Sequence, residues 1–259
     1  MKSRKKILIV KLGSGLLAAS RGGINRSLIG DFAEQIAQLH KRKYQVILVS
    51  SGAVSSGMMA LNIEKRPKDM HELQVCATIG QPRLMQAYQE AFSKFNICTG
   101  QILLTRWDLD SRKMYENTQV TVQKLLALGN CVPIFNENDA ITFDELTFGD
   151  NDTLSAHIAI LAKASLLVIL TSVDGLKSCA DGAGKLIRQV KKITPKIESF
   201  AGHTHSERSV GGMISKIQAA RTVTQEGIPM VIANGKIPNV LLKIARGKSV
   251  GTLFTAHSR

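Results

Sequence analysis

The chain is poor in cysteine, with four residues in 259. They stand tens of residues apart and form no Cys-x-x-Cys pair, at Cys76, Cys98, Cys131 and Cys179. This spacing argues against a disulfide framework and predicts reduced, buried thiols in a cytosolic protein.

Long apolar runs are also missing. The longest runs, such as 166–170, fall far short of the roughly 20 apolar residues that a helix needs to cross a bilayer. A basic stretch followed by apolar residues near the start imitates an export signal, but Lys11, Gly13 and Gly15 interrupt the apolar core that such a signal needs. We therefore expect a cytoplasmic protein without a membrane span.

Acidic and aromatic residues are scarce, and the formal net charge is +14. Most of the excess lies in 177–259, which holds 14 basic and 4 acidic residues. Such a balance first suggests a nucleic-acid partner. However, the basic residues are scattered, and the same segment has two Phe and no Trp or Tyr to stack on bases. The sequence therefore favours a generally basic surface, or a face for a small polyanion, and no nucleic acid.

Short apolar runs bounded by turn residues alternate with stretches of helical periodicity. Strands are expected at 6–10, 46–49, 100–104, 131–135, 166–170 and 230–233, and helices at 29–39, 73–95 (with Pro82 near a turn or kink), 118–128, 153–162 and 213–226. This alternation predicts an α/β fold, an αβα sandwich around a mainly parallel sheet. We expect one domain, 1–259, divided softly near Leu166 into lobes of about 1–165 and 166–259, with loop or hairpin structure at 177–209.

Two glycine-containing turns follow the first two expected strands. Residues 13–18 match the dinucleotide pattern G-x-G-x-x-A, but the second strand ends in Ser50-Ser51-Gly52 and offers no acid for ribose hydroxyls. A Walker A sequence is absent as well. Lys11 stands where the first strand meets its turn, and a cation beside backbone N–H groups suits phosphate oxygens.

Two polar clusters are the most informative segments. The run 136–139, Asn-Glu-Asn-Asp, follows an expected strand, and 150–153, Asp-Asn-Asp-Thr, opens an expected helix. Ordinary helix capping explains one or two residues of the second cluster, and Asp152 is one of the candidates. Asn and Asp side chains also suit a zwitterion, and an acid near two lysines can fix their positions. The ligand spacing of a calcium loop is missing.

The last third adds one more glycine turn and a histidine pair. Gly211-Gly212 precedes an expected helix, and Lys216 lies one helical turn after its start. This arrangement fits a tight turn or a phosphate contact equally well. His203-x-His205 lacks a cysteine or acid at a suitable spacing, so we expect a solvated loop and no metal site.

Seven motifs carry a resemblance to a known family. They are Lys11 to Ser14, Ser51 to Ala53, Gly100 to Arg106, Asn136 to Asp139, Gly149 to Ala156, Gly211 to Lys216 and Gly251 to Phe254. In this order, and over essentially the whole chain, they resemble the glutamate 5-kinase branch of the amino acid kinase family. Gly-Gln-x-Leu-Leu-Thr-Arg together with Asn-Glu-Asn-Asp separates this branch from its relatives.

The resemblance implies an αβα enzyme that transfers the γ-phosphoryl group of ATP to the γ-carboxylate of L-glutamate, the first step of proline synthesis, with ATP and Mg²⁺ as cofactors. It implies a catalytic set in which Asp152 orients two phosphate-contacting lysines, Lys11 and Lys216. The implied glutamate-binding positions are Ser51, Gly52, Asn136, Asp139 and Asn151. The implied ATP-binding positions are Lys11, Gly13, Thr171, Ser172, Val210, Gly211, Gly212, Met213, Ile214, Ser215 and Lys216.

The chain departs from the family pattern at two positions on the nucleotide side. Ser172 stands where the family usually has Asp, and Val210 replaces the usual Thr before Gly-Gly. The chain also ends soon after Gly251 to Phe254, which predicts a form without the C-terminal PUA domain. For partners we expect L-glutamate and ATP, coupling to glutamyl phosphate reductase, and a homo-oligomer.

Two alternatives stay open at this point. One is another kinase of the same family, acting on acetylglutamate, aspartate, carbamate or a nucleotide. The other is a basic RNA-binding protein.

Overall fold

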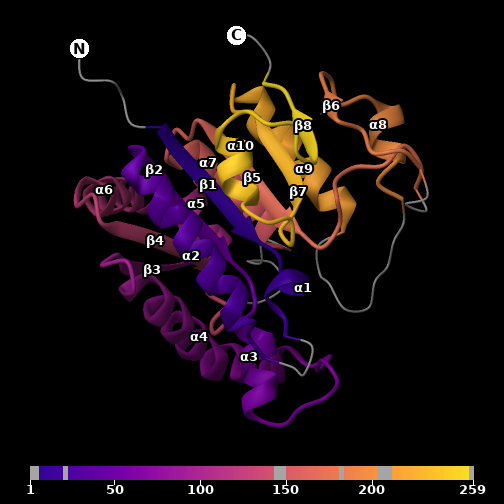
Figure 1. The fold of residues 1–259 in the computed structure, drawn as a ribbon. Coiled ribbons are helices and arrows are strands. Elements are labelled where there is room, and N and C mark those ends of the chain that lie inside the picture. Colours follow the sequence, from indigo (N-terminus) through magenta and orange to yellow (C-terminus); the bar gives the residue numbers. More distant parts are fainter. Residues whose placement is uncertain (1–5, 20–22, 143–149, 181–183, 203–211, 257–259) are drawn as a thin grey trace.

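One eight-stranded sheet organises the molecule (Figure 1). The computed structural model describes residues 6–19, 23–142, 150–180, 184–202 and 212–256. The strands are β1 (Lys6–Leu12), β2 (Tyr44–Ser50), β3 (Cys98–Leu104), β4 (Cys131–Glu137), β5 (Leu166–Thr171), β6 (Gln189–Val190), β7 (Met230–Asn234) and β8 (Thr252–Phe254). Their order is β3-β4-β2-β1-β5-β7-β8-β6, and every neighbouring pair is parallel except β7 with β8. The expected α/β class with a mainly parallel sheet is therefore confirmed.

Helices cover both faces of the sheet. They are α1 (Ser14–Leu17), α2 (Arg26–Lys41), α3 (Ala53–Ala60), α4 (Met70–Ser93), α5 (Arg106–Asp110), α6 (Arg112–Ala127), α7 (Asn151–Leu161), α8 (Pro195–Ser199), α9 (Met213–Gln225) and α10 (Val240–Ala245). One apolar cluster joins Val10 of β1 to α2, α4 and α10, and a second joins Ile9 of β1 to α6, α7 and α9. Because neighbouring residues of a strand point to opposite faces, this split shows the αβα sandwich directly.

The central strands are buried on both faces, as continuous apolar runs in parallel sheets usually are. Residues 8–12 of β1 and 46–50 of β2 are buried throughout. In the part of the chain that the structure describes, no helix is long and apolar enough to cross a membrane.

Several expectations need correction at this level. Helix α4 continues through Pro82, and α6 begins six residues earlier than predicted. Residues 177–209 do contain a hairpin-like bridge between Lys177 and Leu186, but also β6 and α8. The four cysteines are unpaired, yet only two are buried, and Cys98 and Cys179 are exposed. Cys98 is exposed because β3 is an edge strand with one uncovered side.

The parallel strands end at one edge of the sheet, and this edge positions the candidate site. Strands β1, β2, β4 and β5 end there at Leu12, Ser50, Glu137 and Thr171. The division expected near Leu166 falls at the start of β5, which pairs with β1 in the middle of the sheet. Both proposed lobes therefore contribute strand ends to the same edge.

Candidate active site

Lys11 lies near the end of β1, between β2 and β5 in the middle of the sheet. Only 5% of this residue is exposed. Burying an ammonium group inside the sheet costs folding free energy unless an opposite charge lies beside it. The partner comes from the first turn of α7.

Asp152 of α7 is fully buried and bridges two lysines. Its Oδ1 lies 2.5 Å from Lys11 Nζ, and its Oδ2 lies 2.9 Å from the Nζ of Lys216, in the first turn of α9. Burial raises the pKa of the Asp152 carboxyl, but the two ammonium groups outweigh it and hold the pKa below its usual range. The site therefore places an ionised carboxylate between two buried cations that it cannot neutralise together.

Asp150, and not Asp152, caps helix α7. The Asp150 carboxylate accepts hydrogen bonds from the backbone N–H groups of Asp152 and Thr153, the latter at 3.3 Å. Burial and the nearby Asp152 carboxylate raise the pKa of Asp150. The alternative that Asp152 is a helix cap is therefore wrong, and its side chain is free to serve the lysines.

The turn before α9 completes the charged cluster. Lys216 Nζ donates to the carbonyl oxygen of Gly212 at 3.2 Å. The Ser215 hydroxyl oxygen lies 3.0 Å from Asp152 Oδ2 and 2.9 Å from the same carbonyl oxygen, so its one hydrogen can be donated to either acceptor. A Cβ atom at Gly13 would lie 3.9 Å from Lys11 Nζ, so the first glycine turn also borders the cluster.

A second network begins at Asn151, the neighbour of Asp152. Asn151 Nδ2 donates to the carbonyl oxygen of Ser50 at 2.9 Å, to the Ser51 hydroxyl at 3.1 Å and to Asn136 Oδ1 at 3.0 Å. Gly52 follows at φ 107°, a left-handed conformation that favours glycine and turns the chain into α3. Asn151 thus contacts two other predicted glutamate-binding positions, Ser51 and Asn136.

Asp139 follows the end of β4 and is half-buried. Burial raises the pKa of its carboxyl to about 6, and the nearby Arg66 opposes this change. The Asp139 carboxyl therefore has a higher pKa than the Asp152 carboxyl, whose pKa is lowered.

The remaining predicted nucleotide positions are less closely joined. Thr171 ends β5 and its carbonyl oxygen accepts from Gly235 N at 2.9 Å, whereas Ser172 and Ile214 are exposed and Met213 is half-buried. Val210 and Gly211 lie outside the described residues, as do both histidines of the His203-x-His205 pair.

Gln81 contacts the site, although no sequence motif indicated it. This buried residue of α4 accepts a hydrogen bond from Asn136 Nδ2 at 2.9 Å. Its position inside a long helix gives no local signal of such a contact.

Among the described residues, no group of three His, Cys, Asp or Glu side chains could hold a metal ion. Both Asp152 oxygens already face ammonium groups. The residues that the structure describes therefore do not fit a metal ion held by the protein alone.

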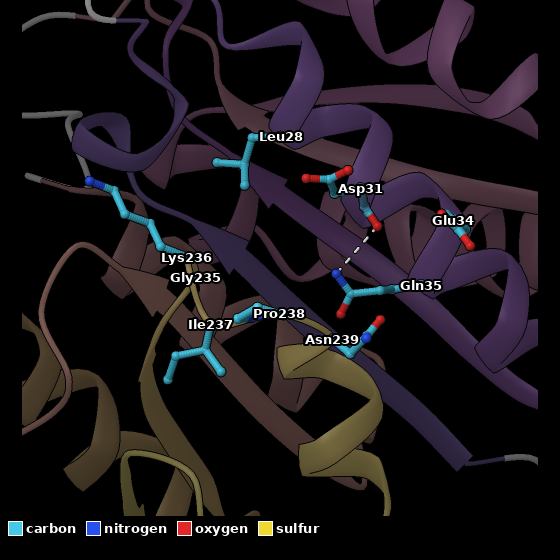
Figure 2. Close-up of a pocket in the computed structure, with 9 residues that line it drawn as sticks. All are labelled: Leu28, Asp31, Glu34, Gln35, Gly235, Lys236, Ile237, Pro238 and Asn239. Atoms are coloured by element: carbon cyan, nitrogen blue, oxygen red, sulfur yellow. Dashed lines mark hydrogen bonds between the residues drawn. The ribbon is translucent and has the colours of Figure 1, made fainter.

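A separate cavity of about 290 Å³ lies between α2 and the β7–α10 connection (Figure 2). Its lining residues are Leu28, Asp31, Glu34, Gln35, Gly235, Lys236, Ile237, Pro238 and Asn239. None of them belongs to the charged cluster or to the amide network, so this cavity is distinct from the candidate site.

Comparisons with known proteins agree with this architecture. The amino acid kinase family matches residues 6–234. The structure of a carbamate kinase from Giardia superposes with a TM-score of 0.68 at 20% identity, covering 98% of this chain and 100% of that one. A UMP kinase from Bacillus anthracis gives a TM-score of 0.67 at 19% identity, covering 98% and 97%. At these identities the likeness shows the fold alone.

Curated relatives are much more similar in sequence. A glutamate 5-kinase from Geobacter sulfurreducens is 44% identical over 255 residues, covering 97% of this chain and 68% of the relative. One from Nitrosomonas eutropha is 45% identical over 254 residues, covering 96% and 67%. The chain therefore belongs to the amino acid kinase family and, within it, groups with the glutamate 5-kinases.

Proposed function

We propose that this protein transfers the γ-phosphoryl group of ATP to the γ-carboxylate of L-glutamate and forms L-glutamyl 5-phosphate, the first step of proline biosynthesis. The observation that carries the proposal is the buried cluster in which Asp152 holds Lys11 and Lys216 at the carboxyl edge of the sheet. The similarity to glutamate 5-kinases over nearly the whole chain supports glutamate as the acceptor.

The chemistry needs cations more than it needs a base. A γ-carboxylate is already ionised at pH 7, so no group has to remove a proton from the nucleophile. The difficulty is that an anion must approach a phosphate that is also an anion. Catalysis then rests on positioning and on preorganised positive charge.

Lys11 and Lys216 contact the transferred phosphoryl group in this proposal. Asp152 is a positioning residue that keeps the two ammonium groups in place, and Ser215 and Gly212 fix the Lys216 side of the cluster. The Asp152 carboxylate carries one negative charge against two ammonium groups, and the raised pKa of the nearby Asp150 weakens the opposing charge of that second carboxyl.

The amino acid and the nucleotide occupy different sides of the cluster. Residues of about 1–165 bind glutamate, through Ser51, Gly52, Asn136, Asp139 and Asn151. Residues of about 166–259 bind the nucleotide through Thr171, Ser172 and 210–216, with Lys11 and Gly13 contributing from the other lobe. Mg²⁺ enters as part of the MgATP substrate, since ATP phosphates and water usually supply most of its ligands.

Three further expectations belong to the same proposal. The protein forms a homo-oligomer, its labile acyl phosphate passes to glutamyl phosphate reductase, and it works in the cytoplasm. Ser172 and Val210 affect nucleotide affinity, because both depart from the family pattern on the nucleotide side.

A substrate panel tests the proposal. The protein is incubated with MgATP and, in parallel, L-glutamate, N-acetylglutamate, aspartate, carbamate or UMP. Hydroxylamine traps acyl phosphates as hydroxamates, and ADP release reports turnover of the other acceptors. We expect hydroxamate with L-glutamate at a kcat/KM well above that of any other acceptor. Preferred turnover of another acceptor would contradict the proposal. So would no turnover combined with salt-dependent RNA binding.

A further inference from the structure

A chain of three side-chain amides leads from the interior of α4 to the amino-acid side of the site. Gln81 Oε1 accepts from Asn136 Nδ2, and Asn136 Oδ1 accepts from Asn151 Nδ2. Gln81 is 9% exposed and Asn136 is 2% exposed, so water has little access to these bonds. Unmade hydrogen bonds at such positions are costly.

Backbone groups determine which way each amide points. The Glu137 N–H can only donate, so the Asn136 atom that it contacts at 3.0 Å must be the carbonyl oxygen. The Ser50 carbonyl can only accept, so the Asn151 atom that it contacts at 2.9 Å must be the amide nitrogen. These two backbone contacts therefore set the direction of the hydrogen bonds along the three amides.

This direction leaves one acceptor unused. Asn151 Oδ1 is buried and has no hydrogen-bond partner among the residues that the structure describes, although Asn151 Nδ2 has three. Buried polar atoms without a partner are uncommon in folded proteins. An acceptor held in this way fits an N–H donor from a ligand, and the ammonium group of an amino acid is such a donor.

Close helix packing sets the position of Gln81. A Cβ atom at Gly80 would lie 1.8 Å from the Ala53 carbonyl oxygen, and one at Gly57 would lie 1.8 Å from the Cys76 carbonyl oxygen. Helices α3 and α4 therefore touch backbone to backbone. Because α3 begins directly after Gly52, this contact ties Gln81 to the turn that carries Ser51.

We infer that Gln81 is a positioning residue for the amino-acid substrate. It holds the Asn136 amide, which orients Asn151 so that Asn151 Oδ1 receives the α-ammonium group. The inference rests on the proposed function, because it takes L-glutamate as the ligand. Gln81 itself contacts no substrate and has no role in phosphoryl transfer.

Steady-state kinetics of Gln81→Met, Gln81→Glu and the control Gln35→Met test this role. Methionine keeps the size of the side chain but removes the acceptor for Asn136. Glutamate keeps a carboxyl oxygen at that position, so it is the conservative variant. Gln35 is another buried glutamine, whose Oε1 accepts from Leu241 N at 3.0 Å, and it lines the separate cavity of Figure 2.

We expect Gln81→Met to raise the KM for L-glutamate about tenfold, with kcat and the KM for ATP changed less than about twofold. Gln81→Glu should recover much of that loss. Glutarate carries both carboxylates of glutamate without the ammonium group, so its inhibition constant should be unchanged in Gln81→Met. Gln35→Met should lower the melting temperature while leaving the KM for L-glutamate unchanged.

The possible failures are distinguishable. A wild-type protein that is inactive with L-glutamate overturns the proposed function. A wild-type protein that is active, with an unchanged KM for L-glutamate in Gln81→Met, overturns the role of Gln81. Equal loss of glutamate and glutarate binding also overturns it, since the ammonium group would not be involved. If Gln81→Met does not fold, a Gln81→Glu protein with a KM for L-glutamate raised more than about tenfold contradicts the inference.

Discussion

Asn151 and Asp152 are neighbours in the first turn of α7, yet one belongs to a neutral hydrogen-bond network and the other to a charged cluster. Asp152 is an anion between two buried ammonium groups, whereas Asn151 is a neutral amide joined to other amides, a hydroxyl and a backbone carbonyl. Adjacent residues of a helix point about 100° apart, so one turn can serve both. The difference suggests a division of labour, with charge for phosphoryl transfer and neutral hydrogen bonds for holding the amino acid.

The largest expected effect concerns the two lysines. Lys11→Ala and Lys216→Ala should each lower kcat about a hundredfold or more, because each removes preorganised charge from the place where phosphate charge migrates. The KM for L-glutamate should change far less. Lys113→Ala, which removes an exposed lysine of α6, is the control and should keep its kcat. Near-normal turnover in a folded lysine variant would remove that lysine from the site.

Asp152→Asn should affect both stability and catalysis. It leaves two buried ammonium groups without their carboxylate, which costs about 3–5 kcal/mol of unfolding free energy. Urea unfolding measures this loss, and kcat should fall with it. Asp150→Asn is the matched control, because asparagine caps a helix almost as well as aspartate. Equal stability in the two variants would mean that Asp152 does not hold the lysines.

A substitution in the neutral hydrogen-bond network around Asn151 should change the KM for L-glutamate. Asn151→Ala removes hydrogen bonds to Ser50, Ser51 and Asn136, and should raise the KM for L-glutamate about tenfold or more with little change in the KM for ATP. Asn25→Ala removes a comparable hydrogen bond from the start of α2 and should leave both KM values alone. A rise in the KM for ATP instead would show that the two sides of the site are assigned in reverse.

The smallest effect should appear as a pH dependence. Burial raises the pKa of Asp139 to about 6, so its carboxylate becomes neutral as the pH falls through this value. If this charge attracts the ammonium group of glutamate, the KM for L-glutamate should rise up to about tenfold per pH unit below 6. Asp139→Asn should raise the KM at pH 7.5 and flatten the profile between pH 5 and about 7. A wild-type profile without a break near 6 would exclude this role.

The sequence predicted β1 to β5 and β7 because each is a short apolar run between periodic helices, but it did not predict the short strands β6 and β8. It missed α3 and α10, since helices of eight and six residues contain too few turns to show periodicity. Burial of Cys98 was predicted wrongly, because the sequence does not tell which strand lies at the edge of the sheet.

The sequence likewise predicted part of the candidate site. Residues that directly follow the expected strands 6–10 and 131–135, such as Lys11 and Asn136, could be selected as candidates, and the resemblance supplied the pairing of Asp152 with two lysines. The choice of Asp150 as the cap of α7 depends on backbone geometry that the sequence leaves open. The contact of Gln81 depends on the glycine packing of α3 against α4, which is a tertiary feature.

Calorimetric titration of L-glutamate without ATP tests the division of labour most directly. The account predicts that Lys216→Ala binds L-glutamate within about threefold of the wild-type Kd, whereas Asn151→Ala binds it at least about tenfold more weakly. An equal loss of glutamate affinity in the two variants would contradict it, because the charged and neutral networks would then act as one.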